Sequence, residues 1–186
     1  MAKKIFNQSI EALLNSQVIL YPTDTVWGLG CDATSIDAVA KIFKLKNRVE
    51  SKSLVVLVSS IKMLCSYVHK VPQKAIDIIT TTKKPTTIIY NNPKGLAANA
   101  IASDNTIAIR IPSHDYCLEL INKFGKPIIS TSANISGEST PKSFSEISLP
   151  ILEGVDYVVN LEQDKITDKS STILKIVGND IEVIRA

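Results

Sequence analysis

Short apolar runs rich in valine and isoleucine recur along the chain, and each stops at a proline or at small polar residues. Val18–Tyr21 ends at Pro22, Leu54–Val58 ends at a serine pair, and Ile107–Ile111 ends at Pro112. Runs of this length and composition are typical of buried strands. Leu54–Val58 is apolar on both faces, which is typical of a central strand.

Segments with helical spacing separate these strands. The apolar positions from Ile36 to Phe43 recur every three or four residues after Thr34 and Ser35, either of which can cap a helix. Asp115–Phe124 has the same spacing and is followed by a glycine. Thr172–Val177 and Ile181–Arg185 flank Gly-Asn-Asp and predict an antiparallel hairpin. The same criteria predict a helix that begins at Ser59 or Ser60 and ends near Val68, and a second helix over 72–80. They also predict strands over 86–90, 128–130 and 157–160. The alternation predicts one α/β domain with a mixed sheet.

Length and charge limit what the chain can do. A chain of 186 residues that is 45% hydrophobic can bury a sizeable core, and we expect residues 1–186 to form a single domain. A net charge of +3 is too small to indicate nucleic-acid binding by itself. Of the 21 basic residues only three are arginine, namely Arg48, Arg110 and Arg185. Only arginine offers a fixed fork for carboxylate or phosphate, so these three are candidates for anion binding.

Cysteine usage and the N-terminus bear on the compartment. The three cysteines are widely spaced and form no pair or Cys/His cluster, which disfavours a disulfide framework or a zinc site. No signal peptide is recognisable, and no apolar run approaches the roughly 20 residues of a membrane span. We therefore expect a cytoplasmic protein that does not enter a membrane.

Three polar clusters follow predicted strands or helices. Tyr-Pro-Thr-Asp-Thr at 21–25 precedes Gly-Leu-Gly, Lys46, Arg48 and Lys52 follow the first predicted helix, and Ser-Thr-Ser-Ala-Asn occupies 130–134. Open α/β sheets place ligands at such positions, and basic and hydroxyl side chains suit an anion. Each cluster also has a purely structural interpretation, respectively a turn with local hydrogen bonds, a solvated charge run and a surface loop.

Covalent catalysis is poorly supported by the sequence. His69 and His114 are the two imidazoles, neither lies next to a cysteine, and no G-x-S-x-G motif occurs. No metal-ligand spacing is present either, although Mg²⁺ carried in by a nucleotide needs few protein ligands. The residues alone favour an anion-binding α/β domain without a covalent nucleophile.

The ordered set of clusters resembles the YrdC-like family of threonylcarbamoyl-AMP synthases across nearly the whole chain. The segments that carry the resemblance are YPTDTVWGLG at 21–30, KNR at 46–48, LVVLV at 54–58, PTTI at 85–88, AIRIP at 108–112, STSANISG at 130–137, ST at 171–172 and IR at 184–185.

The resemblance implies a twisted open mixed sheet with flanking helices around a large, positively lined cavity. It also implies synthesis of threonylcarbamoyl-AMP and pyrophosphate from L-threonine, bicarbonate and ATP, with Mg²⁺ accompanying the ATP. A downstream tRNA threonylcarbamoyl-transferase complex would use the product, and the cavity allows weak binding of tRNA or other RNA.

The family's site residues carry over to matching positions here. Those implied to bind threonine are Thr25, Arg110, Ser130 and Ser171. Those implied to bind ATP are Lys46, Arg48, Lys52, Thr106, Ser132, Asn134, Thr140 and Arg185. The resemblance implies no metal ligand from the protein and no catalytic nucleophile.

The chain departs from the family pattern in a few places. Leu57 stands where many relatives carry a histidine, and Trp27 replaces the usual tyrosine of the first loop. Two alternatives stay open beside the synthase. One is an RNA-binding module without turnover, which the small charge and few aromatics disfavour. The other is a carbamoyl-transfer domain of the hydrogenase-maturation type, which sits in long chains with zinc-finger modules.

Overall fold

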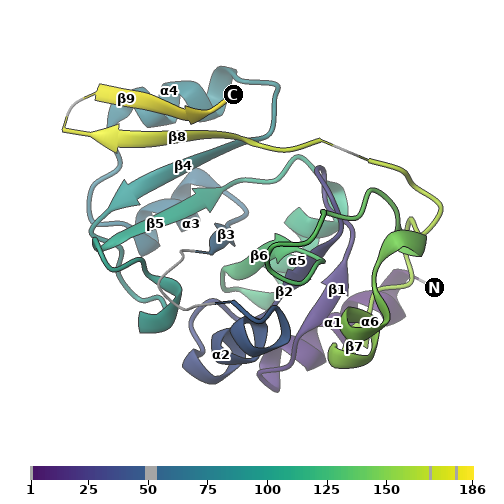
Figure 1. Cartoon of the computed structure of the whole chain (residues 1–186). Helices are drawn as coiled ribbons and strands as arrows, with labels where there is room; N and C mark the ends of the chain where they lie inside the picture. Colours follow the sequence, from purple (N-terminus) through teal and green to yellow (C-terminus); the bar gives the residue numbers. More distant parts are fainter. Residues whose placement is uncertain (1, 49–53, 168, 179) are drawn as a thin grey trace.

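The computed structural model describes residues 2–48, 54–167, 169–178 and 180–186 (Figure 1). The helices are α1 (Ala2–Leu14), α2 (Ile36–Leu45), α3 (Ile61–Tyr67), α4 (Gln73–Thr81), α5 (Asp115–Phe124) and α6 (Leu149–Gly154), with short 3-10 turns at Ala98–Ala100 and Phe144–Glu146. The strands are β1 (Ile19–Tyr21), β2 (Gly28–Gly30), β3 (Val55–Leu57), β4 (Thr86–Asn91), β5 (Thr106–Arg110), β6 (Ile128–Ser132), β7 (Tyr157–Val158), β8 (Thr172–Val177) and β9 (Asp180–Arg185).

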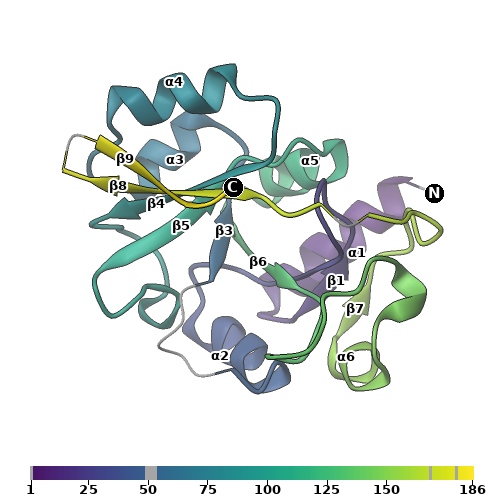
Figure 2. The same cartoon turned by 45° about the horizontal axis from the view of Figure 1, so that its top comes forward.

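The strands form a mixed sheet in the order β7-β1-β2-β6-β3-β5-β4-β8-β9. The pairs β1–β7, β3–β5 and β4–β8 are parallel, and the remaining neighbours are antiparallel. The sheet is twisted, with α4 beside β9 at one end of the molecule and α2 at the other (Figures 1 and 2). The predicted mixed α/β fold is therefore confirmed.

Strand β3 lies between β5 and β6, as its two-faced apolar pattern predicts. Val56 and Leu57 are both fully buried and belong to different hydrophobic clusters. The first cluster packs α2, α3 and α4 against the sheet, and the second packs α1 and α5 against β1 and β6. The sheet thus carries a core on both faces, which fixes the strand ends relative to one another.

The predicted helix boundaries follow from their caps. The Ser35 hydroxyl accepts a hydrogen bond from the Ala38 amide at the start of α2, and the Ser60 hydroxyl accepts one from the Met63 amide at the start of α3. Helix α5 ends at Gly125, whose φ of 77° is left-handed and suits glycine.

Helix α1 and strand β2 are not predicted from the sequence. Helix α1 packs on α5, where Phe6 stacks on Tyr116 at 5.1 Å between ring centroids and the Ser9 hydroxyl lies 2.7 Å from the Tyr116 hydroxyl. Strand β2 is Gly-Leu-Gly, and a Cβ at Gly30 would lie 2.6 Å from Tyr21 Cε1. Strand β2 depends on tertiary contacts, so local sequence pattern does not reveal it, whereas Ile5, Phe6, Ile10 and Leu13 of α1 have the spacing of an amphipathic helix.

Among the residues that the structure describes, no helix is long and apolar enough to cross a bilayer.

Candidate anion and amino-acid site

A cavity of about 390 Å³ opens where the first loop, the ends of β5 and β6 and the start of β8 converge. Basic side chains line it, and hydroxyl groups are numerous between them. The basic residues are Arg48, Arg110, Lys142, Lys169 and Arg185. The hydroxyl residues are Thr25, Thr87, Ser130, Thr131, Ser132, Thr140, Ser170 and Ser171. No carboxylate side chain is among the described residues that line the cavity, so it suits an anionic ligand.

The four residues predicted to bind threonine all line this cavity. Thr25 lies in the loop between β1 and β2, Arg110 ends β5, Ser130 lies in β6, and Ser171 directly precedes β8. The central sheet brings these four distant segments together. Their position is what the resemblance implies, and their role stays a prediction.

The first loop is held by a local turn. The Thr23 hydroxyl accepts from the Thr25 amide at 3.0 Å and donates to the Val26 carbonyl at 2.7 Å. The Thr23 and Thr25 hydroxyl oxygens are 3.0 Å apart. The turn interpretation of this cluster is therefore confirmed, and the turn places Thr25 at the cavity, whereas binding of a ligand by the cluster stays a prediction.

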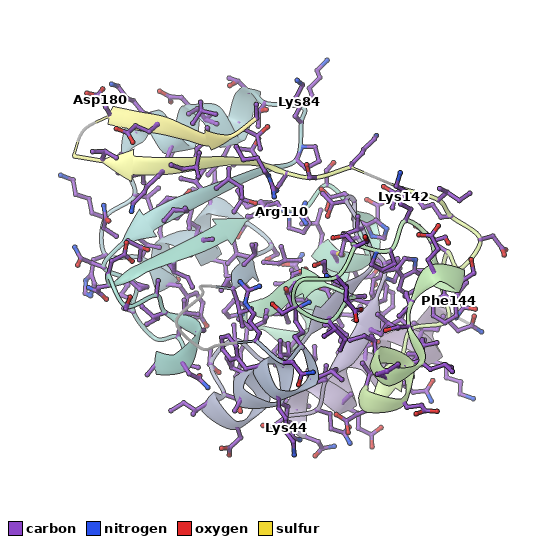
Figure 3. All side chains as sticks on the ribbon, viewed as in Figure 1. Lys44, Lys84, Arg110, Lys142, Phe144 and Asp180 are labelled. Atoms are coloured by element: carbon purple, nitrogen blue, oxygen red, sulfur yellow. The ribbon has the colours of Figure 1, made fainter. Side chains whose placement is uncertain are left out.

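Arg110 forms a buried ion pair beneath the first loop. Its Nη1 lies 2.6 Å from Asp24 Oδ1, and its Nη2 lies 3.5 Å from the Thr25 hydroxyl. The Asp24 Oδ2 accepts from the Ser113 amide at 3.1 Å. Figure 3 shows Arg110 near the centre of the molecule, below the segment that leads to β8.

Ser171 directly precedes β8, and residues of the two strands that flank β8 bond to it. The Thr87 hydroxyl of β4 donates to the Ser171 hydroxyl at 2.8 Å. Arg185 of β9 donates from Nε and Nη2 to the Ser171 carbonyl at 3.2 and 2.7 Å. Arg185 thus lines the cavity and also fixes the backbone before β8.

The residues predicted to bind ATP separate into two groups. Arg48, Ser132, Thr140 and Arg185 line the cavity, whereas Lys46, Thr106 and Asn134 do not. Lys52 lies outside the described residues. Thr106 is buried at the opposite end of β5 from Arg110, and its hydroxyl donates to Asp104 Oδ1 at 2.6 Å. The structure therefore does not bring Thr106 to the cavity.

Lys46 lies beneath the loop that follows β6. The side chain is buried, and its Nζ donates to the carbonyl oxygens of Ser132 and Asn134 at 2.5 and 2.6 Å, with Asn134 Oδ1 at 3.4 Å. Asn134 Oδ1 accepts from the Ser132 hydroxyl at 2.5 Å. Lys46 and Asn134 thus hold Ser132 in place from behind the cavity wall. Burial, together with the nearby charge of Arg48, lowers the pKa of Lys46 to about 8.

That pKa gives a pH prediction. Because the pKa is lowered, the folded chain loses this proton at lower pH than the unfolded chain, so burial costs stability below about pH 8 and the cost fades as the pH rises toward 10.5. The neutral amine has one donor fewer and no charge, so we expect ATP affinity to fall several-fold from about pH 7 to about pH 9. Calorimetric titration with ATP at each pH measures the affinity. The variant Lys46→Arg keeps its charge, so its ATP affinity should not change over this pH range. An equal loss of ATP affinity in the wild-type protein and in this variant would contradict the role of the Lys46 charge.

Lys142 and Lys169 were not predicted from the sequence. Each lies two residues from a predicted site residue, Thr140 and Ser171 respectively, and that proximity is the only local signal. In a chain with so many lysines such a signal is weak. Leu57, at the position where many relatives carry histidine, is buried in the second core and does not line the cavity.

Lys169 and Ser170 of the connector between β7 and β8 line the cavity. Figures 1 and 2 show this connector crossing the molecule toward β8. The Thr167 hydroxyl donates to the Thr25 carbonyl, and the Thr167 amide donates to the Lys142 carbonyl at 2.8 Å. These bonds join the connector to the first loop and to the segment after β6. The contacts bring Lys142 and Lys169 to the same cavity as Arg110.

Known proteins resemble this chain in sequence and in fold. The sequence model of the Sua5/YciO/YrdC family, which carries the description "Telomere recombination", matches residues 11–186. The threonylcarbamoyl-AMP synthase of Pseudoalteromonas translucida (strain TAC 125) is 35% identical over 159 residues, which cover 82% of this chain and 83% of that protein.

Two solved structures share the fold. The crystal structure of P. abyssi Sua5 complexed with L-threonine has a TM-score of 0.90 at 24% identity, over 100% of this chain and 54% of that one. E. coli YciO has a TM-score of 0.85 at 23% identity, over 98% of this chain and 88% of that one.

Proposed function

The chain belongs to the Sua5/YciO/YrdC family, and we propose that it is a threonylcarbamoyl-AMP synthase that uses L-threonine, bicarbonate and ATP. The observation that carries the proposal is the single cavity in which Arg110 and three hydroxyl residues face the same space as Arg48, Lys142, Lys169 and Arg185. An amino acid and a triphosphate can therefore meet there. Relatives that are 35% and 32% identical, matched over more than four fifths of both sequences, carry this name, which favours the synthase over the hydrogenase-maturation alternative.

The reaction needs binding and orientation more than it needs a protein nucleophile. The amine of threonine adds to carbon dioxide derived from bicarbonate and loses a proton, which gives a carbamate. A carbamate oxygen then bonds to the α-phosphorus of ATP, the bond from that phosphorus to the bridging oxygen breaks, and pyrophosphate leaves with the electron pair. Phosphoryl-centre reactions of this kind are accelerated mainly by positioning and by neutralising charge.

Different residues of the cavity would bind the two substrates. Arg110 would bind the threonine carboxylate, with Thr25, Ser130 and Ser171 around the rest of the amino acid. Arg48, Lys142, Lys169 and Arg185 would neutralise the phosphates. ATP would enter as its Mg²⁺ complex, in which phosphate oxygens and water supply most of the ligands, since the cavity wall offers hydroxyls and no described carboxylate.

The product would serve a downstream tRNA threonylcarbamoyl-transferase complex, and we propose that the reaction takes place in the cytoplasm.

A non-enzymatic RNA-binding role is the second candidate, because the cavity is lined by basic residues. Tight tRNA binding that weakens steeply with salt, together with no turnover, would favour it.

Pyrophosphate release tests the proposal. We expect release from ATP only when threonine and bicarbonate are both present, and little release when either is omitted. Release that requires neither substrate would identify an ATP hydrolase and contradict the synthase.

A further inference from the structure

We infer that Asp24 is a positioning residue that reserves Arg110 for the carboxylate of an amino acid and keeps phosphate away from it. The inference rests on the proposed function and adds a residue to its threonine site. Asp24 does not line the cavity, so it would act through the Arg110 guanidinium and not by touching the substrate.

Both oxygens of the Asp24 carboxylate are engaged. Oδ1 lies 2.6 Å from Arg110 Nη1, and Oδ2 accepts from the Ser113 amide at 3.1 Å. The side chains of Arg110 and Asp24 are only 4% and 8% exposed. Ser113 lies three residues after Arg110, so the carboxylate joins the first loop to the segment that leaves β5. This arrangement fixes the orientation of the guanidinium and compensates its positive charge.

Orientation matters because a guanidinium binds a carboxylate through a planar fork. It has five N–H donors. Asp24 takes one at Nη1, and Nη2 lies 3.5 Å from the Thr25 hydroxyl. Arg110 lines the cavity, so the donors that remain can face a ligand there. Without Asp24, the guanidinium could rotate. Its remaining N–H donors would then no longer face the part of the cavity that lies between Thr25 and Ser130.

Charge matters because the same cavity is proposed to hold a triphosphate. The Asp24 carboxylate compensates the charge of Arg110 at close range in a buried setting. A singly charged carboxylate can still make two hydrogen bonds to the guanidinium, whereas a multiply charged phosphate is repelled by Asp24. The amino-acid end of the cavity therefore selects a zwitterion, and the other basic residues attract the phosphates.

Asp24→Asn separates this role from simple support of the fold, because it keeps the shape and removes the charge. We expect the KM for threonine to rise about 10- to 100-fold, the scale that misplacement of a binding group produces. The KM for ATP should stay within about two-fold, and competitive inhibition by inorganic phosphate against threonine should become stronger. Asp37→Asn, at an exposed aspartate in the first turn of α2, is the matched control and should change none of these.

Two further variants keep the test decisive. Asp24→Glu keeps the charge but displaces it, so the KM for threonine should rise while inhibition by phosphate stays at the wild-type level. In the double variant Asp24→Asn, Arg110→Lys, the loss of threonine affinity should be no larger than in Arg110→Lys alone, because the two residues act as one unit. Equal rises in the KM for both substrates, additive losses, or unchanged phosphate inhibition in Asp24→Asn would overturn the inference.

Calorimetric binding of threonine distinguishes this inference from the proposed function. It needs no turnover, so wild-type protein that binds threonine but releases no pyrophosphate would contradict the synthase alone. Wild-type turnover with unchanged threonine affinity in Asp24→Asn would contradict the role of Asp24 alone.

Discussion

Replacing Arg110 with lysine is expected to raise the KM for threonine by about 100-fold, because lysine cannot reproduce the planar fork. The KM for ATP is expected to stay within about two-fold. Arg110 is buried against Asp24, and a lysine there keeps the positive charge, so the ion pair and the fold should survive. Steady-state kinetics with each substrate varied in turn measure both values.

The two substrates provide the internal control for Arg110→Lys. A loss confined to threonine supports a carboxylate role for this residue. Equal losses for threonine and ATP would show that Arg110 serves the whole cavity, and unchanged threonine kinetics would remove it from the site.

Replacing Arg48 with alanine is expected to weaken ATP binding by about 30- to 100-fold, on the scale of a charged hydrogen-bond partner lost from a partly buried site. Arg48 lines the cavity just after α2. Threonine binding should change little, since the residues assigned to threonine lie on other elements. Titration calorimetry with ATP and with threonine measures the two affinities separately.

Lys44→Ala is the matched control for Arg48→Ala. Lys44 lies in the last turn of the same helix, is exposed, and lies at the lower end of the molecule in Figure 3, away from Arg110 and Lys142. If this variant weakens ATP binding as much as Arg48→Ala, the effect is long-range attraction and the phosphate assignment of Arg48 is wrong.

The sequence predicts the strands best where burial alone determines them. Leu54–Val58 is apolar on both faces, and the strand it forms is central, with Val56 in the first core and Val55 and Leu57 packed in the second. Helix α1 is not predicted, although Ile5, Phe6, Ile10 and Leu13 have helical spacing. The face that they form packs on α5 through contacts such as Phe6 with Tyr116. The Gly-Leu-Gly strand is not predicted because close packing on Tyr21, and not β propensity, selects glycine at position 30.

The site was predictable to the extent that it consists of contiguous motifs. The residues assigned to threonine meet in one cavity although most of the strands near them are not adjacent, since β3 lies between β6 and β5 and β4 lies between β5 and β8. Lys46 and Asn134 belong to the same motifs but face the interior of a loop, and sequence does not reveal the direction of a side chain. Lys142 and Lys169 reach the cavity only because the connector before β8 bonds to Thr25 and to the segment after β6.

The most direct test of the synthase is the fate of the carbon of bicarbonate. The purified protein is incubated with ATP, threonine and isotopically labelled bicarbonate, and the nucleotide products are separated and weighed by mass spectrometry. We predict a product with the mass of threonylcarbamoyl-AMP that carries the label in its carbamoyl group, formed in equal amount to pyrophosphate. Threonyl-AMP without the label, or AMP and pyrophosphate alone, would contradict the account.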